Sequence, residues 1–115
     1  MIESNQEVEM YAREVTMHLK ADSDTRFTQK LEKEIIPLLR KQRGFKDEIA
    51  LFVSGNRKAV AISFWDNKEN AEAYNKAKYP EVLRSMSEVI EGTPQVETFD
   101  VSNSTWYKIA SPIAV

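Results

Sequence analysis

Hydrophobic and polar positions alternate over residues 9–20, which predicts a first β-strand with one mostly apolar and one mostly polar face. The spacing then changes to that of a helix, with apolar positions at Phe27, Leu31, Ile35, Leu38 and Leu39. Residues 22–24 supply N-cap oxygens before this helix, and Gly44 supplies a stop after it. Pro37 lies inside the helical pattern and predicts a kink or a second short helix there.

Residues 45–54 and 58–65 predict two further strands, joined by a turn at Gly55 and Asn56. Both faces of this hairpin are apolar: Ile49, Leu51 and Val53 alternate with Ala50 and Phe52, and Val60, Ile62 and Phe64 alternate with Ala59, Ala61 and Trp65. A hairpin with one solvated face would alternate apolar with polar residues, so each face needs a cover. Helices can cover one face, and a second copy of the chain is the economical cover for the other.

A second helical region begins at Asp66, with Glu69 at the spacing of a capping box. Its apolar stripe is broken at Pro80 and resumes up to Gly92. Residues 94–103 predict a fourth strand. The order of strand, helix, strand, strand, helix, strand is that of a ferredoxin-like split β-α-β arrangement, an α+β fold. We therefore expect a four-stranded antiparallel sheet with helices on one face.

The length of the chain predicts one domain over residues 1–115, with its core in about residues 8–103. Residues 104–115 are unusually apolar for a chain end, since they include Trp106, Tyr107, Ile109, Ile113 and Val115. Such a segment either folds back over its own sheet or crosses to a partner subunit, and we favour an arm at the subunit interface.

Composition limits the partners that the chain can bind and the chemical groups that it can use. A net charge of −2 provides no basic field for nucleic acid or an anionic membrane. The absence of cysteine excludes disulfides and thiolate nucleophiles and fits the cytoplasm. One histidine without a tight acidic cluster gives no usual metal-ligand set, and the three glycines each fit a turn or a helix end. We expect no metal, no cofactor, no signal peptide and no membrane span.

Three segments carry a family resemblance: PLLRKQRGF at the end of the first helix, VAISFWDNKENAEAY between the third strand and the second helix, and YPEVLRSM beyond it. In this order, over about residues 8–103, they resemble the antibiotic-biosynthesis-monooxygenase-like (ABM) domains of the dimeric α+β barrel superfamily. The resemblance implies a homodimer in which two four-stranded sheets face each other to form a barrel with helices outside. It also implies scattered activities, from cofactor-free oxidation of polycyclic aromatic molecules to haem degradation.

The resemblance also points to individual residues. Trp65 matches a Trp at the end of the third strand that both the cofactor-free and the haem-degrading members use, and Tyr74 lies near a Tyr of the cofactor-free members. The haem-degrading members also use an Asn in the first strand and a His about ten residues after the Trp. Here residues 14–16 and Asn75 occupy those places.

Trp65, Tyr74 and Phe27 are thus the predicted substrate-binding residues, and Trp65, Tyr74 and His18 are the candidate catalytic residues. Histidine is the natural general base near neutrality. Each candidate has a structural alternative. Trp65 can fill the core or the subunit interface, because an indole buries a large area. Tyr74 and Tyr79 can be packed rings, and His18, on the polar face of the first strand, can be solvated or bonded at an interface.

The sequence supports three functions. The first is a cofactor-independent monooxygenase that acts on a hydrophobic aromatic small molecule held between the sheet and the helices. The second is a small-molecule-binding or stress-associated dimer without catalysis. The third is a haem-degrading monooxygenase, which we rank last because two of its three residues are missing.

Overall fold

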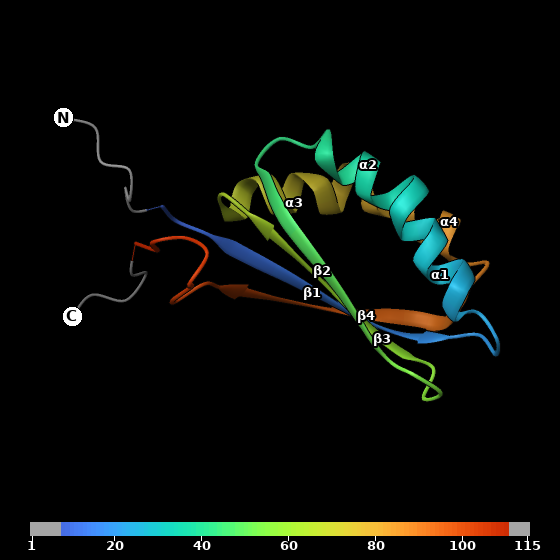
Figure 1. The fold of residues 1–115 in the computed structure, drawn as a ribbon. Coiled ribbons are helices and arrows are strands. Elements are labelled where there is room, and N and C mark those ends of the chain that lie inside the picture. The colour runs from blue at the N-terminus through green and yellow to red at the C-terminus, as the bar shows by residue number, and fades with distance from the viewer. Residues whose placement is uncertain (1–7, 111–115) are drawn as a thin grey trace.

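The computed structural model describes residues 8–110. The elements in chain order are β1 (Tyr11–Leu19), α1 (Asp24–Lys30), the π-helix η1 (Leu31–Ile35), α2 (Ile36–Arg40), β2 (Phe45–Val53), β3 (Lys58–Trp65), α3 (Lys68–Ala77), α4 (Tyr79–Met86) and β4 (Ile90–Asp100). The strands form one antiparallel sheet in the order β2-β3-β1-β4, and the helices all lie on one side of it (Figure 1). The predicted α+β, ferredoxin-like fold is confirmed.

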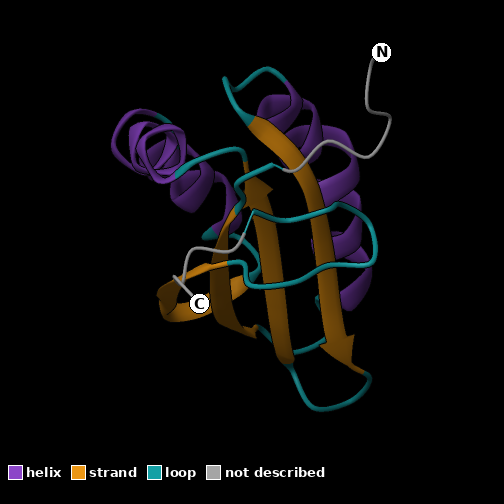
Figure 2. Cartoon of the chain, turned by 90° about the vertical axis from the view of Figure 1, so that its left-hand side faces the viewer, coloured by secondary structure: helices purple, strands orange, loops and turns teal. Residues whose placement is uncertain are grey.

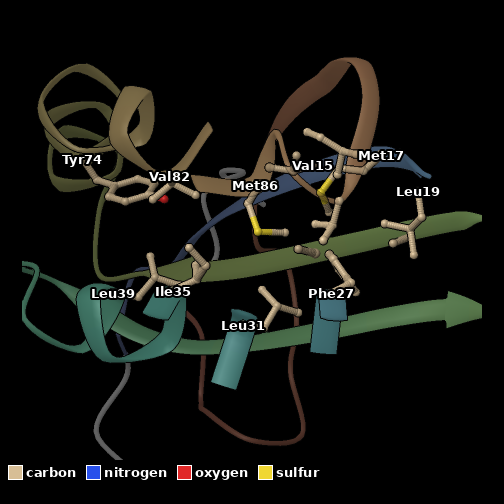
Figure 3. Packing of buried hydrophobic residues seen from close by; sticks show 14 of the residues in the cluster. Val15, Met17, Leu19, Phe27, Leu31, Ile35, Leu39, Tyr74, Val82 and Met86 are labelled. Carbon is tan, nitrogen blue, oxygen red and sulfur yellow. The ribbon is translucent and has the colours of Figure 1, made fainter. Parts of the chain in front are cut away.

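The core lies between the sheet and the helices. Alternate residues of β1 and β3 point towards the helices and are buried there, including Val15, Met17, Ala59, Ala61 and Trp65. The helices contribute the other half of the core, with Phe27, Leu31, Ile35 and Leu39 from one helical region and Tyr74, Val82 and Met86 from the other (Figure 3). The period-two and helical patterns of the sequence therefore meet in a single apolar layer.

The first helical region changes its geometry just before Pro37. Residues 31–35 form a π-turn, and Pro37 then lies in the first turn of α2, where its missing N–H costs little. The prediction of a kink or a second short helix at Pro37 is confirmed. The wider π-turn lets the chain reach the proline without losing its apolar face, because Leu31, Ile35 and Leu39 all remain buried.

The second helical region also divides at a proline, since α3 ends at Ala77 and Pro80 lies in the first turn of α4. The prediction that Asp66 caps α3 is wrong by one residue. Asn67 is the N-cap, and its side chain accepts a 2.8 Å hydrogen bond from the backbone N–H of Asn70. Asp66 is instead held by its own backbone N–H, which donates to the Gly44 carbonyl at 2.8 Å.

The fourth strand begins earlier than the sequence pattern predicts. The pattern places the strand at residues 94–103 and runs the preceding helix to Gly92, but the helix ends at Met86 and β4 spans Ile90–Asp100. Ile90 pairs with Leu19 of β1, so the apolar residue assigned to the helix stripe lies in the sheet. The pairing then shifts register, and Gly92 takes a positive φ of 68° in this stretch. Such an irregularity is invisible to a periodic pattern.

Beyond β4, the described part of the C-terminal segment folds back over its own sheet. Trp106 packs edge-on against Phe64, with ring centroids 5.7 Å apart, and the Tyr107 hydroxyl donates a hydrogen bond to the Asp47 carboxylate. In Figure 2 a loop crosses in front of the strands on this side. Residues 111–115, the rest of the predicted arm, lie outside the described residues. No helix within residues 8–110 is long and apolar enough to cross a membrane.

The side of the sheet turned away from the helices, called the open face below, carries exposed apolar residues. They are Leu51 and Val53 of β2, Phe99 of β4 and Trp106, which are 51%, 57%, 43% and 59% exposed. Val60, Ile62 and Phe64 of β3 continue this surface and are half-buried. The prediction that both faces of the β2–β3 hairpin are apolar is therefore confirmed, and the helices cover only one of them.

Candidate functional site

A cavity lies between the sheet and the helices. Its apolar lining includes Val15, Leu31, Ile35, Leu39, Val82 and Met86. Figure 3 shows Tyr74 and Val82 on one side of this space and Ile35 and Leu39 on the other. The free volume is about 40 Å³, which is below the roughly 300 Å³ of ordinary small-molecule sites. A fused-ring ligand would therefore have to move the two helical regions apart.

The contacts that hold the two helical regions together at the surface are polar and exposed. The Ser85 hydroxyl donates a 2.8 Å hydrogen bond to Glu34, and Arg26 forms a 2.9 Å ion pair with Glu88. Lys30, whose side chain is only 12% exposed, lies 3.7 Å from Glu88 as well. The exposed contacts contribute little net free energy, about 0 to 1 kcal/mol each, so they oppose opening only weakly.

One polar row crosses the helix-covered face of the sheet at the cavity. Arg13 of β1 and Glu48 of β2 both pair with Ser63 of β3, so the three side chains project from neighbouring strands at the same level. All three line the cavity. The row next to it contains Val15, Ala61 and Ala50. Ala61 is buried and lines the cavity, and its small side chain leaves free space beside the polar row, whereas Ala50 is exposed and does not line the cavity.

Arg13 is the positive group of this row and is only 3% exposed. Its guanidinium donates a 2.7 Å hydrogen bond to the side-chain oxygen of Asn75 and lies 4.0 Å from the centre of the Tyr79 ring. The Tyr74 ring is 5.3 Å away. Stacking on aromatic faces suits a planar, weakly hydrated guanidinium. Asn75 and the two tyrosines therefore hold Arg13 in place at the cavity.

Glu48 is the negative group of the row. Its Oε1 atom is buried and has no hydrogen-bond partner within residues 8–110. Burial raises the pKa of Glu48 from its ordinary value of 4.5 to about 7. A carboxyl group that exchanges a proton near neutrality, at the wall of an apolar cavity, is suited to acid–base chemistry.

Tyr74 and Tyr79 form the aromatic side of the cavity, with ring centroids 6.3 Å apart. Burial raises the pKa of both hydroxyls, and the Arg13 charge opposes that shift. Glu48 also raises the pKa of Tyr74, which places its carboxylate within electrostatic reach of that ring. The Tyr79 hydroxyl is buried and has no hydrogen-bond partner in the described part of the chain.

Trp65 lies behind this aromatic side and does not line the cavity itself. The indole is fully buried and packs against Tyr74 at 5.0 Å and against Phe45 at 5.6 Å between ring centroids. Of the sequence-predicted substrate residues, only Tyr74 faces the cavity. Phe27 is buried in the core on α1 without lining the cavity, and His18 is exposed on β1, on the open face of the sheet.

Sequence reasoning missed Arg13 and Glu48. The signal was nevertheless present, because the inward positions of β1 read Tyr11, Arg13, Val15 and Met17, so a charged residue interrupts an apolar series. Glu48 likewise occupies an inward position of β2, two residues before Ala50. Within residues 8–110, no three His, Asp or Glu side chains come together in a way that could hold a metal ion.

Comparison with known proteins shows which solved structures share this fold. No protein-family model matches the chain, and no curated protein matches it. Among solved structures, the NE2512 protein of unknown function from Nitrosomonas europaea superposes with a TM-score of 0.70 at 14% identity, over 96% of this chain and 99% of that one.

Two oxygenases have the same fold. The monooxygenase from the gene ActVA-Orf6 of Streptomyces coelicolor, solved with the ligand nanaomycin D, gives a TM-score of 0.69 at 12% identity, over 81% of this chain and 88% of that one. A point mutant of SnoaB, a cofactor-independent oxygenase from Streptomyces nogalater, gives 0.67 at 12% identity, over 84% and 96%. The chain has the ABM-like fold that the sequence resemblance predicted.

Proposed function

We propose that the chain binds a hydrophobic aromatic small molecule in the cavity between the sheet and the helices, and that it oxidises this molecule with dioxygen without a cofactor. The observation that carries the proposal is the row of Arg13, Ser63 and Glu48, which brings opposite charges to the wall of an otherwise apolar cavity. Apolar walls suit the rings of such a ligand, and the charged groups suit the movement of a proton and of the charge that it leaves behind.

Cofactor-free oxidation asks little else of the protein, because the substrate supplies the electrons. For an anthrone, the ring methylene and one dioxygen become a ring carbonyl and one water, so atoms and electrons balance without a further reductant. The protein has to exclude water, orient the rings and accept a proton. Tyr74 and Tyr79 would orient the rings, and the apolar residues of η1, α2 and α4 would exclude water.

The fold that the chain shares with SnoaB, a cofactor-independent oxygenase, and with the ActVA-Orf6 monooxygenase supports this reaction class. The apolar open face supports a second part of the proposal, a homodimer. Leu51, Val53 and Phe99 leave a sheet surface that a second copy of the same surface would cover. The facing sheets would then enclose the space between the two copies, as in an α+β barrel.

A binding protein without catalysis is the second candidate, and the position of His18 favours it, because the general base that the sequence predicted lies outside the cavity. Haem degradation is the weakest of the three. His18, the sole histidine of the chain, lies away from the cavity, and Asn75, which occupies the place of the haem-degrading members' His, is bonded to Arg13.

Oxygen uptake with anthrone tests the proposal. The cavity can be filled without removing any functional group by Ala61→Leu, and Ala50→Leu is a matched control at the neighbouring, exposed position of the same row. We expect the wild type and Ala50→Leu to accelerate oxygen uptake above the rate in buffer, and Ala61→Leu to lose most of that acceleration. A wild-type rate equal to that in buffer, with binding retained, would leave the non-catalytic candidate.

A further inference from the structure

Two charged groups of opposite sign face the same cavity without neutralising each other. Neither Arg13 nor Glu48 takes part in any ion pair within residues 8–110. Arg13 is almost fully buried and bonded only to a neutral amide, while Glu48 keeps one buried oxygen without a partner. Leaving buried charges and polar atoms unpaired is costly in a folded protein. A ligand that meets both groups would remove that cost.

The spacing of the two groups limits the kind of ligand. Arg13 and Glu48 are separated by one intervening strand, because both pair with Ser63. Neighbouring strands lie about 4.8 Å apart, so the two backbone positions are roughly 10 Å apart across the row. Ser63 does not fill the gap, since its hydroxyl already accepts a 2.9 Å hydrogen bond from the Trp65 indole. The gap suits a planar ring system with reactive groups on opposite edges.

We propose that Glu48 is the catalytic proton acceptor of the cavity and that Arg13 holds the oxyanion that forms at the opposite edge of the ligand. This inference rests on the proposed function and assigns the two charged side chains of the cavity their roles in that reaction. Anthrone, in which an acidic C–H lies across one ring from a carbonyl oxygen, is the substrate used to test these roles.

The chemistry follows the geometry. The Glu48 carboxylate takes a proton from the ring carbon, so a C–H bond breaks and an O–H bond forms at Glu48. The electron pair moves through the ring to the carbonyl oxygen, which becomes an oxyanion beside the Arg13 guanidinium. Stabilising charge where it develops is an effective way to lower such a barrier. The electron-rich ring then reacts with dioxygen, and the proton held by Glu48 leaves in the water that forms.

The groups that face Glu48 set the pH at which it can act. They are Arg13 from β1, Tyr74 from α3 and Tyr79 from α4, whereas η1 and α2 contribute only apolar side chains such as Leu31, Ile35 and Leu39. Asp47, its neighbour in β2, is bonded to Tyr107 on the open face. Burial brings the pKa of Glu48 to about 7, so its carboxylate form becomes the major one as the pH rises above neutrality.

Exchange of the anthrone methylene hydrogens with deuterated water, followed by NMR without oxygen, tests proton removal separately from oxidation. We expect the wild type to catalyse this exchange, with a rate that rises with pH through about 7. Glu48→Gln should lower the rate by at least about a hundredfold, in line with the loss of a general base. Glu32→Gln, a matched change at an exposed carboxylate of η1, should leave the rate unchanged.

The outcomes separate the inference from the proposed function. Hydrogen exchange by Glu48→Gln at the wild-type rate would overturn the role of Glu48. If the wild type and Glu48→Gln both still took up oxygen, the oxygenase proposal would stand. Failure of the wild type to bind anthrone at all would overturn both. Thermal unfolding of Glu48→Gln with and without anthrone is the control for folding and binding. A cooperative transition whose midpoint rises with anthrone would establish that the variant is folded and still binds. Loss of exchange with binding retained would therefore support the inference.

Discussion

The indole N–H of Trp65 donates a 2.9 Å hydrogen bond to the hydroxyl of Ser63, two residues earlier on the same face of β3. Ser63 in turn donates a long, 3.5 Å bond to the backbone carbonyl of Arg13. These contacts fix the ring behind Tyr74 and within the core. In the described structure Trp65 therefore supports the aromatic side of the cavity, and Tyr74 is the ring that a ligand would meet.

A double-mutant cycle on this bond tests the supporting role of Trp65. Trp65→Phe should lower the free energy of unfolding by about 2 kcal/mol, because it removes buried area and a buried hydrogen bond. Combined with Ser63→Ala, it should show a coupling of about 1 kcal/mol, since each change alone leaves the other partner unsatisfied. Urea unfolding followed by circular dichroism measures both quantities. Strictly additive effects would show that the bond contributes nothing.

Glu48 predicts a pH dependence of stability with a definite sign. Its pKa is raised from 4.5 to about 7 in the folded chain, so folding favours the neutral carboxyl. The resulting stabilisation is complete below about pH 4.5 and is lost as the pH rises through 7. Glu48→Gln should therefore match the wild type in acid and exceed it at pH 8, by up to about 3 kcal/mol. A difference in unfolding free energy that does not change with pH would contradict this.

A charge on the open face should separate the proposed dimer. Leu51 is 51% exposed in β2, so Leu51→Asp should leave the fold of one chain intact while placing a carboxylate in the covered surface. Light scattering should give about 26 kDa for the wild type, twice the 13.2 kDa of one chain, and about 13 kDa for the variant. A wild type that is already monomeric at micromolar concentration would refute the dimer.

Removal of residues 104–115 should weaken the same dimer, because Trp106 adds its ring to the open face beside Phe64. The truncated chain should dissociate at a higher protein concentration than the full chain, as measured by sedimentation. An undiminished dimer would mean that this segment only covers its own sheet.

The fold could be predicted from the sequence because its signals are local and periodic. The alternation in β1 determines which of its side chains point towards the helices, and the apolar residues on both sides of the β2–β3 hairpin predict that each face of the sheet needs a cover. The start of β4 could not be predicted, since Ile90 continues a helical stripe and only pairing with Leu19 places it in the sheet. The N-cap of α3 could not be predicted either, because Asp66 and Asn67 are both suitable capping residues. The backbone hydrogen bond from Asp66 to Gly44 holds Asp66 outside the helix and leaves Asn67 as the cap.

The candidate site was less predictable than the fold. Tyr74 was found because it lies near a Tyr of the cofactor-free family members, whereas Arg13 and Glu48 are ordinary surface-type residues in the sequence. Their place at the cavity follows from the register of three strands, in which Arg13 and Glu48 both pair with Ser63. A charged residue at an inward strand position was the available signal, and its partner lies 35 residues away along the chain. Long-range pairing of this kind follows from the fold and not from spacing.

Methyl NMR of methionine tests most directly whether the cavity is a ligand site. Met17 and Met86 line the cavity, whereas Met10 is buried without lining it and so serves as an internal control. On titration with anthrone under anaerobic conditions, the ring currents of the bound molecule should shift the methyl signals of Met17 and Met86 and leave that of Met10 in place. Signals of Met17 and Met86 that stay unmoved at saturating anthrone would contradict the account.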